Sequence, residues 1–314
     1  MRRLADDGWY VGILPVAFLS VGVFGLISAR GAIEMQRDAV PVRVSPAAEL
    51  YPVAGGRYEA WSQNRRGYRR DFDAYARVGE KRPFRVNRPG THARPGSIDG
   101  TTLVFQEWRG SRSDLRFFNL KQRKRLPTPP GVNTRQWETG GSLSARRLAF
   151  VRISRRKHLA RLVVRFLRSR KQRVILTRRY PKFRVTVGQL NGRYLVATVC
   201  GPRCTIAGYD VQTMKGLKLP QSLIPETQDF APSVTADGTV YFARVFTIDR
   251  CGNDATHLLR VRRSEDEATT IGQVSPEQSV GSTYAASRAG QTNVFYSVGV
   301  CGPNPDIYRL IDPG

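Results

Sequence analysis

The side chains that could do chemistry are few in this chain and lie far apart. The three histidines, His92, His158 and His257, fall in different thirds of the sequence, and none belongs to an HExxH or His/Cys/Cys metal motif. The chain also lacks a GxSxG nucleophile elbow, a P-loop and a dinucleotide fingerprint. We therefore expect no cofactor and no metal, and we assign no catalytic residue. Whether the protein is an enzyme stays open, although these observations favour a non-enzyme.

Four cysteines, Cys200, Cys204, Cys251 and Cys301, give the even number that is typical of disulfides in exported chains. Cys200 and Cys204 could close a short loop, and Cys251 and Cys301 fall at equivalent places of neighbouring repeats. The sequence does not choose among the three pairings. A zinc site would need four converging ligands, and only one close cysteine pair is present. We expect disulfides, which persist in an oxidising compartment.

The net charge of +26 is unevenly distributed along the chain. Residues 101–184 hold 24 Lys and Arg against three acids, whereas residues 185–314 are almost neutral. Such a surface attracts anionic partners, of which an anionic envelope polymer is one. The basic clusters fall at both ends of the predicted blades, however, and aromatic residues do not interleave with them as in nucleic-acid-binding surfaces. Nucleic acid is therefore disfavoured as a partner.

The elements that must position these residues repeat about every 45 residues. The clearest copy spans 233–242, where a strand enters the Asp237-Gly238 turn and a second strand ends on Phe242. The weaker copies end at Trp61, Phe105, Phe150, Ala197 and Tyr296. Asx-Gly between apolar runs predicts a hairpin, and a third strand and a short outer strand follow in the copies. Four strands per unit of this length are typical of a propeller blade.

The sequence thus predicts an all-β fold, a six-bladed β-propeller of four-stranded blades at 50–314, preceded by one N-terminal apolar helix. The sixth copy ends after its third strand, so its outer strand must come from elsewhere. We expect Val40–Val44, in a linker at 32–49, to close blade six, with Pro41 suited to an edge. Gly140-Gly141-Ser142 and Gly281-Ser282 place a serine beside glycine, but both fall at innermost strands. We interpret them as packing residues of a crowded channel rather than nucleophiles.

This pattern resembles the TolB-like six-bladed β-propeller family of exported, WD40-like repeat proteins. The shared element is the strand–Asp-Gly–strand phrase followed by a strand that ends in an aromatic, an Asp or Asn, and an aliphatic residue. Here those endings are Phe118-Asn119-Leu120 and Tyr209-Asp210-Val211. The resemblance implies a periplasmic or extracellular propeller that works by binding.

Residues 1–31 have the features of an export signal. Arg2 and Arg3 precede an apolar run at 9–28, which ends in the small residues around Ala29-Arg30-Gly31. The run is also long enough to span a bilayer, so a cleaved signal peptide and a membrane anchor stand as alternatives. Either one would place the propeller outside the cytoplasm, in a periplasmic, extracellular or membrane-anchored form.

We therefore expect an exported, monomeric propeller that works as a protein-binding or ligand-binding module in the cell envelope or outside the cell. Its partner would be a protein or an anionic polymer, bound at the end of the ring that carries the turns between second and third strands. That predicted face holds Arg65, Arg66, Arg112, Arg155, Arg156, Lys157 and Arg203 together with the cysteines. The alternatives are a secreted hydrolase or lyase with an active site at the channel mouth, and an electrostatic binder of anionic envelope polymers. Convergent carboxylates or histidines in the channel would favour the enzyme; a plugged or hydroxyl-lined channel would favour the binding module.

Overall fold

A computed structural model describes residues 39–43, 47–64, 72–220, 224, 226–246, 256–274, 280–288, 291–298 and 305–312. The N-terminal helix, Arg65, Arg66, Cys251 and Cys301 of the sequence analysis lie outside these residues. Within the described part, no helix combines the length and the apolar character that crossing a membrane requires.

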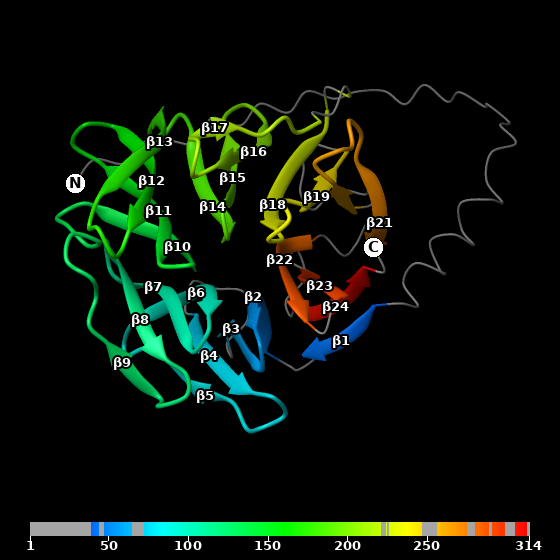
Figure 1. Cartoon of the computed structure of the whole chain (residues 1–314). Coiled ribbons are helices and arrows are strands. Elements are labelled where there is room, and N and C mark those ends of the chain that lie inside the picture. The colour runs from blue at the N-terminus through cyan, green and yellow to red at the C-terminus, as the bar shows by residue number, and fades with distance from the viewer. Residues whose placement is uncertain are drawn as a thin grey trace, which may run out of the picture.

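The described chain forms six antiparallel sheets of four strands each, arranged as the blades of a ring around a channel (Figure 1). Blades one and two consist of β2 (Ala48–Gly55), β3 (Tyr58–Asn64), β4 (Asp73–Val78) and β5 (Phe84–Arg85), then β6 (His92–Asp99), β7 (Thr102–Arg109), β8 (Arg112–Asn119) and β9 (Lys124–Leu126). Blades three and four consist of β10 (Trp137–Ser144), β11 (Arg147–Ser154), β12 (Leu159–Phe166) and β13 (Gln172–Arg179), then β14 (Arg184–Asn191), β15 (Tyr194–Cys200), β16 (Cys204–Asp210) and β17 (Lys215–Gly216). Blades five and six consist of β18 (Gln228–Val234), β19 (Val240–Val245), β20 (Thr256–Val261) and β21 (Thr269–Val274), then β22 (Val280–Arg288), β23 (Gln291–Val298), β24 (Asp306–Asp312) and β1 (Val40–Arg43).

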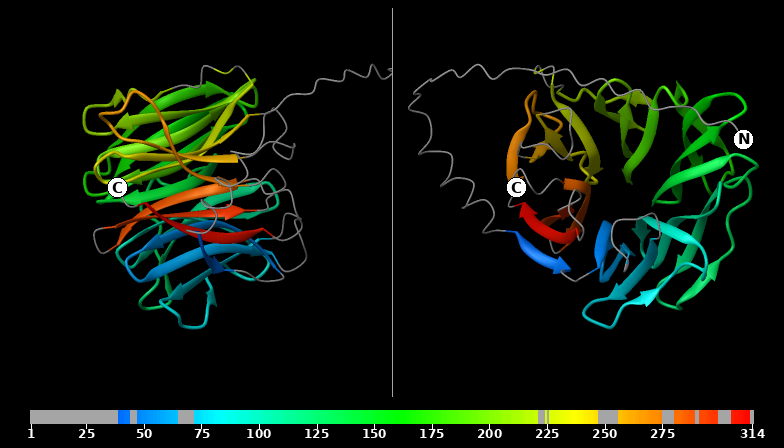
Figure 2. Two further views of the ribbon diagram at one scale, coloured as in Figure 1. Left: turned by 90° about the vertical axis from the view of Figure 1, so that its right-hand side faces the viewer. Right: turned by 180° about the vertical axis from the view of Figure 1, so that it is seen from behind.

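The outermost strand of blade six comes from the beginning of the described chain. β1 pairs antiparallel with β24, with Val40 opposite Arg309, and this is the place expected for the segment at 40–44. The two strands lie side by side in both views of the ring (Figures 1 and 2). Without β1, the outer edge of β24 would be left unpaired.

The repeat-ending residues fill the core between successive blades. Phe105, Phe150 and Phe242 lie on the second strands β7, β11 and β19, and each is fully buried. Burying an aromatic or aliphatic side chain of this size contributes about 1.5–3 kcal/mol. Because each blade packs these residues against the facing sheet of its neighbour, the blades stabilise one another around the ring.

The hairpin between first and second strands uses positive φ in copies with and without the Asx-Gly signal. Gly100 and Gly192 begin two-residue turns and have positive φ, and Gly238 has positive φ in a longer connection at 235–239. In blade three, Ala145 and Arg146 stand there instead, and both adopt positive φ of 48° and 61°. The turn is therefore imposed by the pairing of the strands, even where the sequence does not favour it.

Each innermost strand contains a bulge, and the six bulges meet around the channel. The pairing shifts between Leu50 and Val53, Pro95 and Ser97, Thr139 and Ser142, Val187 and Leu190, Phe230 and Ser233, and Val280 and Thr283. Bulges bend a strand and redirect its side chains. Neighbouring bulges touch closely, since a Cβ on Gly96 would lie 1.8 Å from the carbonyl oxygen of Gly141.

The two serine-glycine segments lie on these innermost strands, as predicted. Ser142 is fully buried on β10, and its Oγ accepts a hydrogen bond from the Leu190 amide of the next blade at 2.8 Å. Ser282 on β22 is also buried, and its Oγ accepts from the Tyr51 amide at 3.2 Å. Both serines connect adjacent blades, as expected of residues that pack at the channel.

Candidate functional site

The channel is closed at one end by a side chain that spans several blades. Gln189 on β14 donates from Nε2 to the Ala285 carbonyl of blade six at 2.8 Å. Its Oε1 accepts from the Val234 amide of blade five at 3.2 Å and from the Ala285 amide at 3.3 Å. Tyr284 packs beside it in the same cluster as Ile98 of blade two, and burial raises the pKa of its hydroxyl. Blades two, four, five and six are thereby connected across the ring axis.

A cavity of about 270 Å³ lies on the other side of this closure, with Tyr284 in its lining. All six innermost strands contribute to the cavity, through the residues at and before their bulges. Those residues lie toward the end of the ring that carries the turns between second and third strands, because the first residues of an innermost strand pair with the last residues of the second. The cavity therefore belongs to the end of the propeller predicted to bind.

Two arginines, Arg94 on β6 and Arg184 on β14, provide the charge of the cavity. The Arg94 guanidinium lies over the Tyr51 ring, with Cζ 3.7 Å from the ring centroid. Arg184 is exposed at the start of its strand. Within the described part of the chain neither arginine pairs with a carboxylate, and none of the described lining residues is Asp, Glu or His. The part of the lining that the structure describes thus carries positive charge and no carboxylate.

Blade four presents a small polar surface to this cavity. Arg184 lies directly opposite Cys200, and Thr186 lies directly opposite Thr198, so the four side chains share one face of β14 and β15. All four line the cavity. Guanidinium and hydroxyl groups on one face form hydrogen bonds to an anion such as a carboxylate or a phosphate.

A disulfide holds the edge of this polar surface in place. Cys200 and Cys204 are bonded at an S–S distance of 2.04 Å and close the hairpin between β15 and β16. The structure thus contains the Cys200–Cys204 disulfide, which was one of the possibilities that the sequence left open. It lies beside the cavity because Cys200 is a lining residue.

The described members of the predicted binding face lie at the same end of the ring but outside the cavity. Arg112 is exposed and contacts Asp114, with Nε 3.4 Å from Oδ2. Arg155 lies over the Trp137 ring at 4.7 Å. Arg156, Lys157 and Arg203 are exposed in turns. The structure brings them to one end, as predicted, but none of them lines the cavity.

Arg94 and Arg184 are not among the predicted site residues, because they lie on innermost strands rather than in turns. A usable signal was present in Arg184-Val185-Thr186-Val187, where polar and apolar residues alternate. Alternation of this kind on an innermost strand leaves one face for the core and one for the channel.

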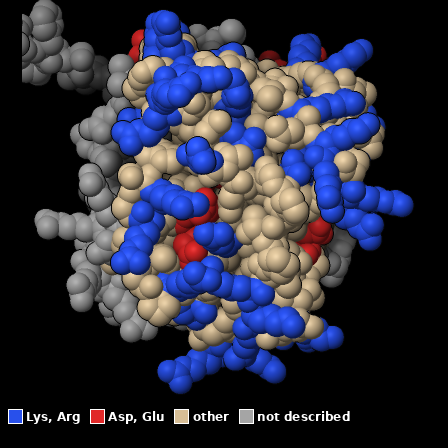
Figure 3. Space-filling view, turned by 90° about the vertical axis from the view of Figure 1, so that its left-hand side faces the viewer, with Lys and Arg blue, Asp and Glu red and all other residues tan. Residues whose placement is uncertain are grey.

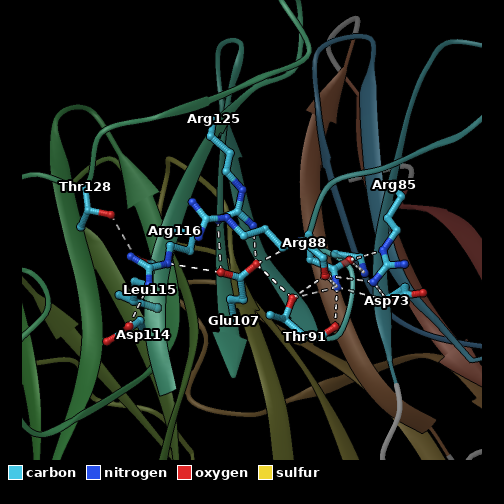
Figure 4. Close-up of polar contacts among 12 residues, drawn as sticks. Asp73, Arg85, Arg88, Thr91, Glu107, Asp114, Leu115, Arg116, Arg125 and Thr128 are labelled. Atoms are coloured by element: carbon cyan, nitrogen blue, oxygen red, sulfur yellow. Dashed lines mark hydrogen bonds and ion pairs between the residues drawn. The ribbon is translucent and has the colours of Figure 1, made fainter. Parts of the chain in front are cut away.

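Three described carboxylates at this end, Glu107, Glu138 and Asp229, bond to side chains within the blades rather than lining the cavity. Glu107 receives hydrogen bonds from the side chains of Arg116, Arg125 and Thr91 (Figure 4). Burial alone would raise the pKa of Glu107, but the bonds from Arg125, the Arg88 amide and Thr91 hold it below its ordinary value. We interpret this carboxylate as structural, because it ties blade two to the segment before β6.

Glu138 in blade three is fully buried and pairs with Arg152, whose Nε lies 2.9 Å from Oε1. Here burial prevails over the bonds from Thr134 and Arg152 and raises the pKa of Glu138. In blade five, Asp229 pairs with Arg244 across the equivalent strands at 2.7 Å. No group of three or more His, Cys, Asp or Glu that could hold a metal ion occurs among the residues that the structure describes.

Comparisons with known proteins identify the fold. No family model matches the chain, and no curated protein matches it. Among solved structures, it is similar to a putative TolB from Agrobacterium tumefaciens, with 11% identity and a TM-score of 0.53 over 86% of this chain and 92% of that chain. It is also similar to TolB from Acinetobacter baumannii, with 12% identity and a TM-score of 0.50 over 77% of this chain and 60% of that chain. The fold is a TolB-like propeller.

The TolB-like propeller fold is shared with an enzyme. An oligogalacturonate lyase in complex with manganese matches 85% of this chain and 89% of its own at 8% identity, with a TM-score of 0.50. The chain spans 60% of the Acinetobacter TolB, so that protein has a further part with no counterpart in the match. The TolB-like resemblance inferred from the sequence is thus confirmed for the fold, and function must be argued from the cavity.

Proposed function

We propose that this TolB-like propeller is a binding module that takes an anionic group of its ligand into the channel cavity. The observation that carries the proposal is the pair Arg94 and Arg184, which line a cavity closed at its inner end and have no carboxylate partner in the described chain. The ligand would be a protein or an envelope polymer that presents a carboxylate, phosphate or sulfate group.

The composition of the lining supports binding over hydrolysis or elimination. A hydrolase or lyase needs a positioned acid or base, for which carboxylates and histidines are the usual groups. The described lining offers guanidinium and hydroxyl groups instead, on Arg94, Arg184, Thr186 and Thr198. Charge-assisted hydrogen bonds from such groups contribute about 1.5–3 kcal/mol each, which suits recognition of an anion.

The fixed geometry of the cavity also supports a binding role. Arg94 is held against Tyr51, and the disulfide at Cys200 holds the hairpin beside Arg184. Donors that are held in place before the ligand arrives lose less conformational entropy on binding. A preformed site of this kind requires little rearrangement of the blades.

The test measures binding of sulfate, phosphate and citrate to the purified full chain by isothermal titration calorimetry. We expect Arg94→Gln and Arg184→Gln each to weaken binding of the best of these anions about tenfold, which corresponds to about 1.4 kcal/mol. Arg112→Gln and Arg156→Gln are matched controls, since they remove the same charge outside the cavity. Equal losses in both pairs, or no binding of any of the three anions, would contradict the proposal.

We further infer that the propeller works outside the cytoplasm. The Cys200–Cys204 disulfide supports this inference because disulfides persist in oxidising compartments, and the apolar run at 9–28 supports it independently. A fusion of the full chain to alkaline phosphatase, which is active only after export, should be active. Deletion of residues 2–31 should abolish the activity, and equal activity of both fusions would argue against export.

A further inference from the structure

The outer edge of blade three differs from the outer edges of the other blades. β13 is the longest outermost strand, with eight residues, whereas β5, β9 and β17 have two, three and two, β1 has four and β21 has six. It pairs with β12 from Gln172 to Arg179, with a bulge at Ile175, and is the last strand of its sheet in the described chain. We infer that this edge is a docking site for an extended acidic polypeptide segment, which adds to blade three as a fifth strand.

The direction of the backbone groups on β13 follows from two hydrogen bonds at its ends. The Tyr180 amide donates to the His158 carbonyl at 2.8 Å, so alternate residues before it, Arg178 and Leu176, also face β12. Thr177 and Arg179 therefore direct their backbone amide and carbonyl groups away from the sheet. In agreement, the Thr177 carbonyl accepts a bond from the Arg178 side chain at 3.1 Å rather than from a strand.

The direction of the backbone groups in the first half of β13 follows from the hydrogen bond at its other end. The Phe166 amide donates to the Lys171 carbonyl at 2.9 Å, which makes Arg173 face β12 and turns Gln172 and Val174 outward. Outward-facing amides and carbonyls along a strand are a template for a further strand. The eight-residue strand spans roughly 26 Å, and the bulge at Ile175 divides this template into two stretches. Val174, half exposed, adds an apolar contact.

The charge around this edge specifies the partner. β13 itself carries exposed Arg173, Arg178 and Arg179. The turn before β12 adds Arg155, Arg156 and Lys157 at one end, and the turn after it adds Arg168, Arg170 and Lys171 at the other. The sequence contains no acid between Glu138 and Asp210. Figure 3 shows the side of the ring where blades two and three lie. Lys and Arg are widespread on it, and Asp and Glu are confined to small patches.

This arrangement joins the basic clusters that the sequence analysis placed at opposite ends of the blades. Because β13 runs from one end of blade three to the other, the clusters and the strand form one continuous basic edge. Like charges oppose pairing of this edge with a second copy of itself, which is how edge strands avoid aggregation. A strand rich in Glu or Asp is attracted to this edge instead, because it gains both backbone hydrogen bonds and ion pairs with the basic side chains.

The experiment uses a fluorescein-labelled, ten-residue peptide in which glutamate alternates with threonine, and measures its binding to the full chain by fluorescence anisotropy. Thr177→Pro removes the outward amide without breaking a bond to β12, and Thr177→Val keeps that amide at the same position. We expect Thr177→Pro to weaken binding about tenfold and Thr177→Val to bind as the wild type does. The double variant Arg178→Gln/Arg179→Gln should also lose binding.

A second measurement keeps the inference testable if Thr177→Pro folds poorly. A peptide of the same charge, N-methylated on alternate amides, should bind the wild-type chain about tenfold more weakly. Equal binding of both peptides, or equal binding by the Pro and Val variants, would overturn strand addition and leave a general anion surface. Heparin binding that is tighter than peptide binding and is unaffected by Thr177→Pro would also indicate a general anion surface and contradict strand addition. Arg94→Gln, which lies in the cavity, should leave peptide binding unchanged and so separates this site from the proposed anion site.

Discussion

At the closed end of the channel, the amide of Gln189 has backbone partners for its nitrogen and its oxygen, whereas at the mouth Arg94 and Arg184 have no carboxylate partner in the described chain. The two ends are built from the same six strands, and both present polar side chains toward the ring axis. Buried polar groups in native proteins are almost always hydrogen-bonded, so the closed end follows the general rule. At the mouth, Arg184 is exposed and Arg94 is partly exposed, so water or a ligand can complete their bonding. This difference separates the structural end from the proposed binding end.

The largest expected effect concerns the bulges between the two ends. In Gly96→Ala the added Cβ would lie 1.8 Å from the Gly141 carbonyl oxygen, and backbone atoms cannot move aside cheaply. We expect the free energy of unfolding to fall by about 3 kcal/mol, measured by urea denaturation. Gly216→Ala is the matched control, because its Cβ would meet nothing closer than the Gly208 oxygen at 4.0 Å. Similar losses in both variants would show that the bulges do not hold the ring together.

A second, smaller effect tests the closed end directly. Gln189→Ala leaves the Val234 amide and the Ala285 carbonyl without their partner, which should cost about 2 kcal/mol of unfolding free energy. The control Gln122→Ala removes an exposed side chain and should change stability by less than about 0.5 kcal/mol. Arg94→Gln and Arg184→Gln should behave like the control in the same urea titration. If the arginine variants were as unstable as Gln189→Ala, the contrast between the two ends would be broken.

The smallest effect is a pH dependence that distinguishes two buried carboxylates behind the mouth. The lowered pKa of Glu107 means that its charged form stabilises the fold above the ordinary glutamate pKa, and that this stability is lost as the pH falls below it. The raised pKa of Glu138 has the opposite sign, so stability rises as the pH falls through its pKa toward the ordinary value. Glu107→Gln should therefore reduce the acid-induced loss of stability, and Glu138→Gln should remove the rise that precedes it.

Urea midpoints measured at several pH values between neutrality and acid would show these changes in slope. Carboxyl chemical shifts in NMR titrations would give the order of the two groups independently, with Glu138 protonated before Glu107 as the pH falls. The reverse order would contradict the opposite directions of the pKa shifts of Glu107 and Glu138.

Much of the fold could be predicted from the sequence because the repeat acts through local chemistry. Turn residues and strand-ending aromatics such as Phe150 and Phe242 recur at a nearly fixed interval. Both signals identify a blade from its own local sequence, without information from the other blades. Blade three was predicted although Ala145-Arg146 replaces the turn signal, because the spacing of its neighbours determines its strands. The same counting placed the strand at 40–44 beside the end of the chain.

The cavity could not be predicted in this way, for a physical reason. A bulge shifts the alternation of side chains, so the face on which Arg94 or Arg184 lies depends on where each strand is bent. Charge counting also misleads, because a few arginines of the basic region form ion pairs with acids inside the blades, as Arg152 does with Glu138. Which basic residues are left without a partner is decided only when distant strands pair.

The pairing of β1 with β24 also bears on the order of events during synthesis. Val40 and Arg309 lie about 270 residues apart, so at roughly 5–20 residues per second β24 is made roughly 15–50 s after β1. Throughout that interval the early blades can stack on one another, but only as an open arc. The nascent chain must keep β1 available, and pairing of β1 with another strand in that time would leave the circle incomplete. Completion of the circle, and with it the closed channel, therefore depends on a strand that must stay unpaired until about 270 further residues have been made.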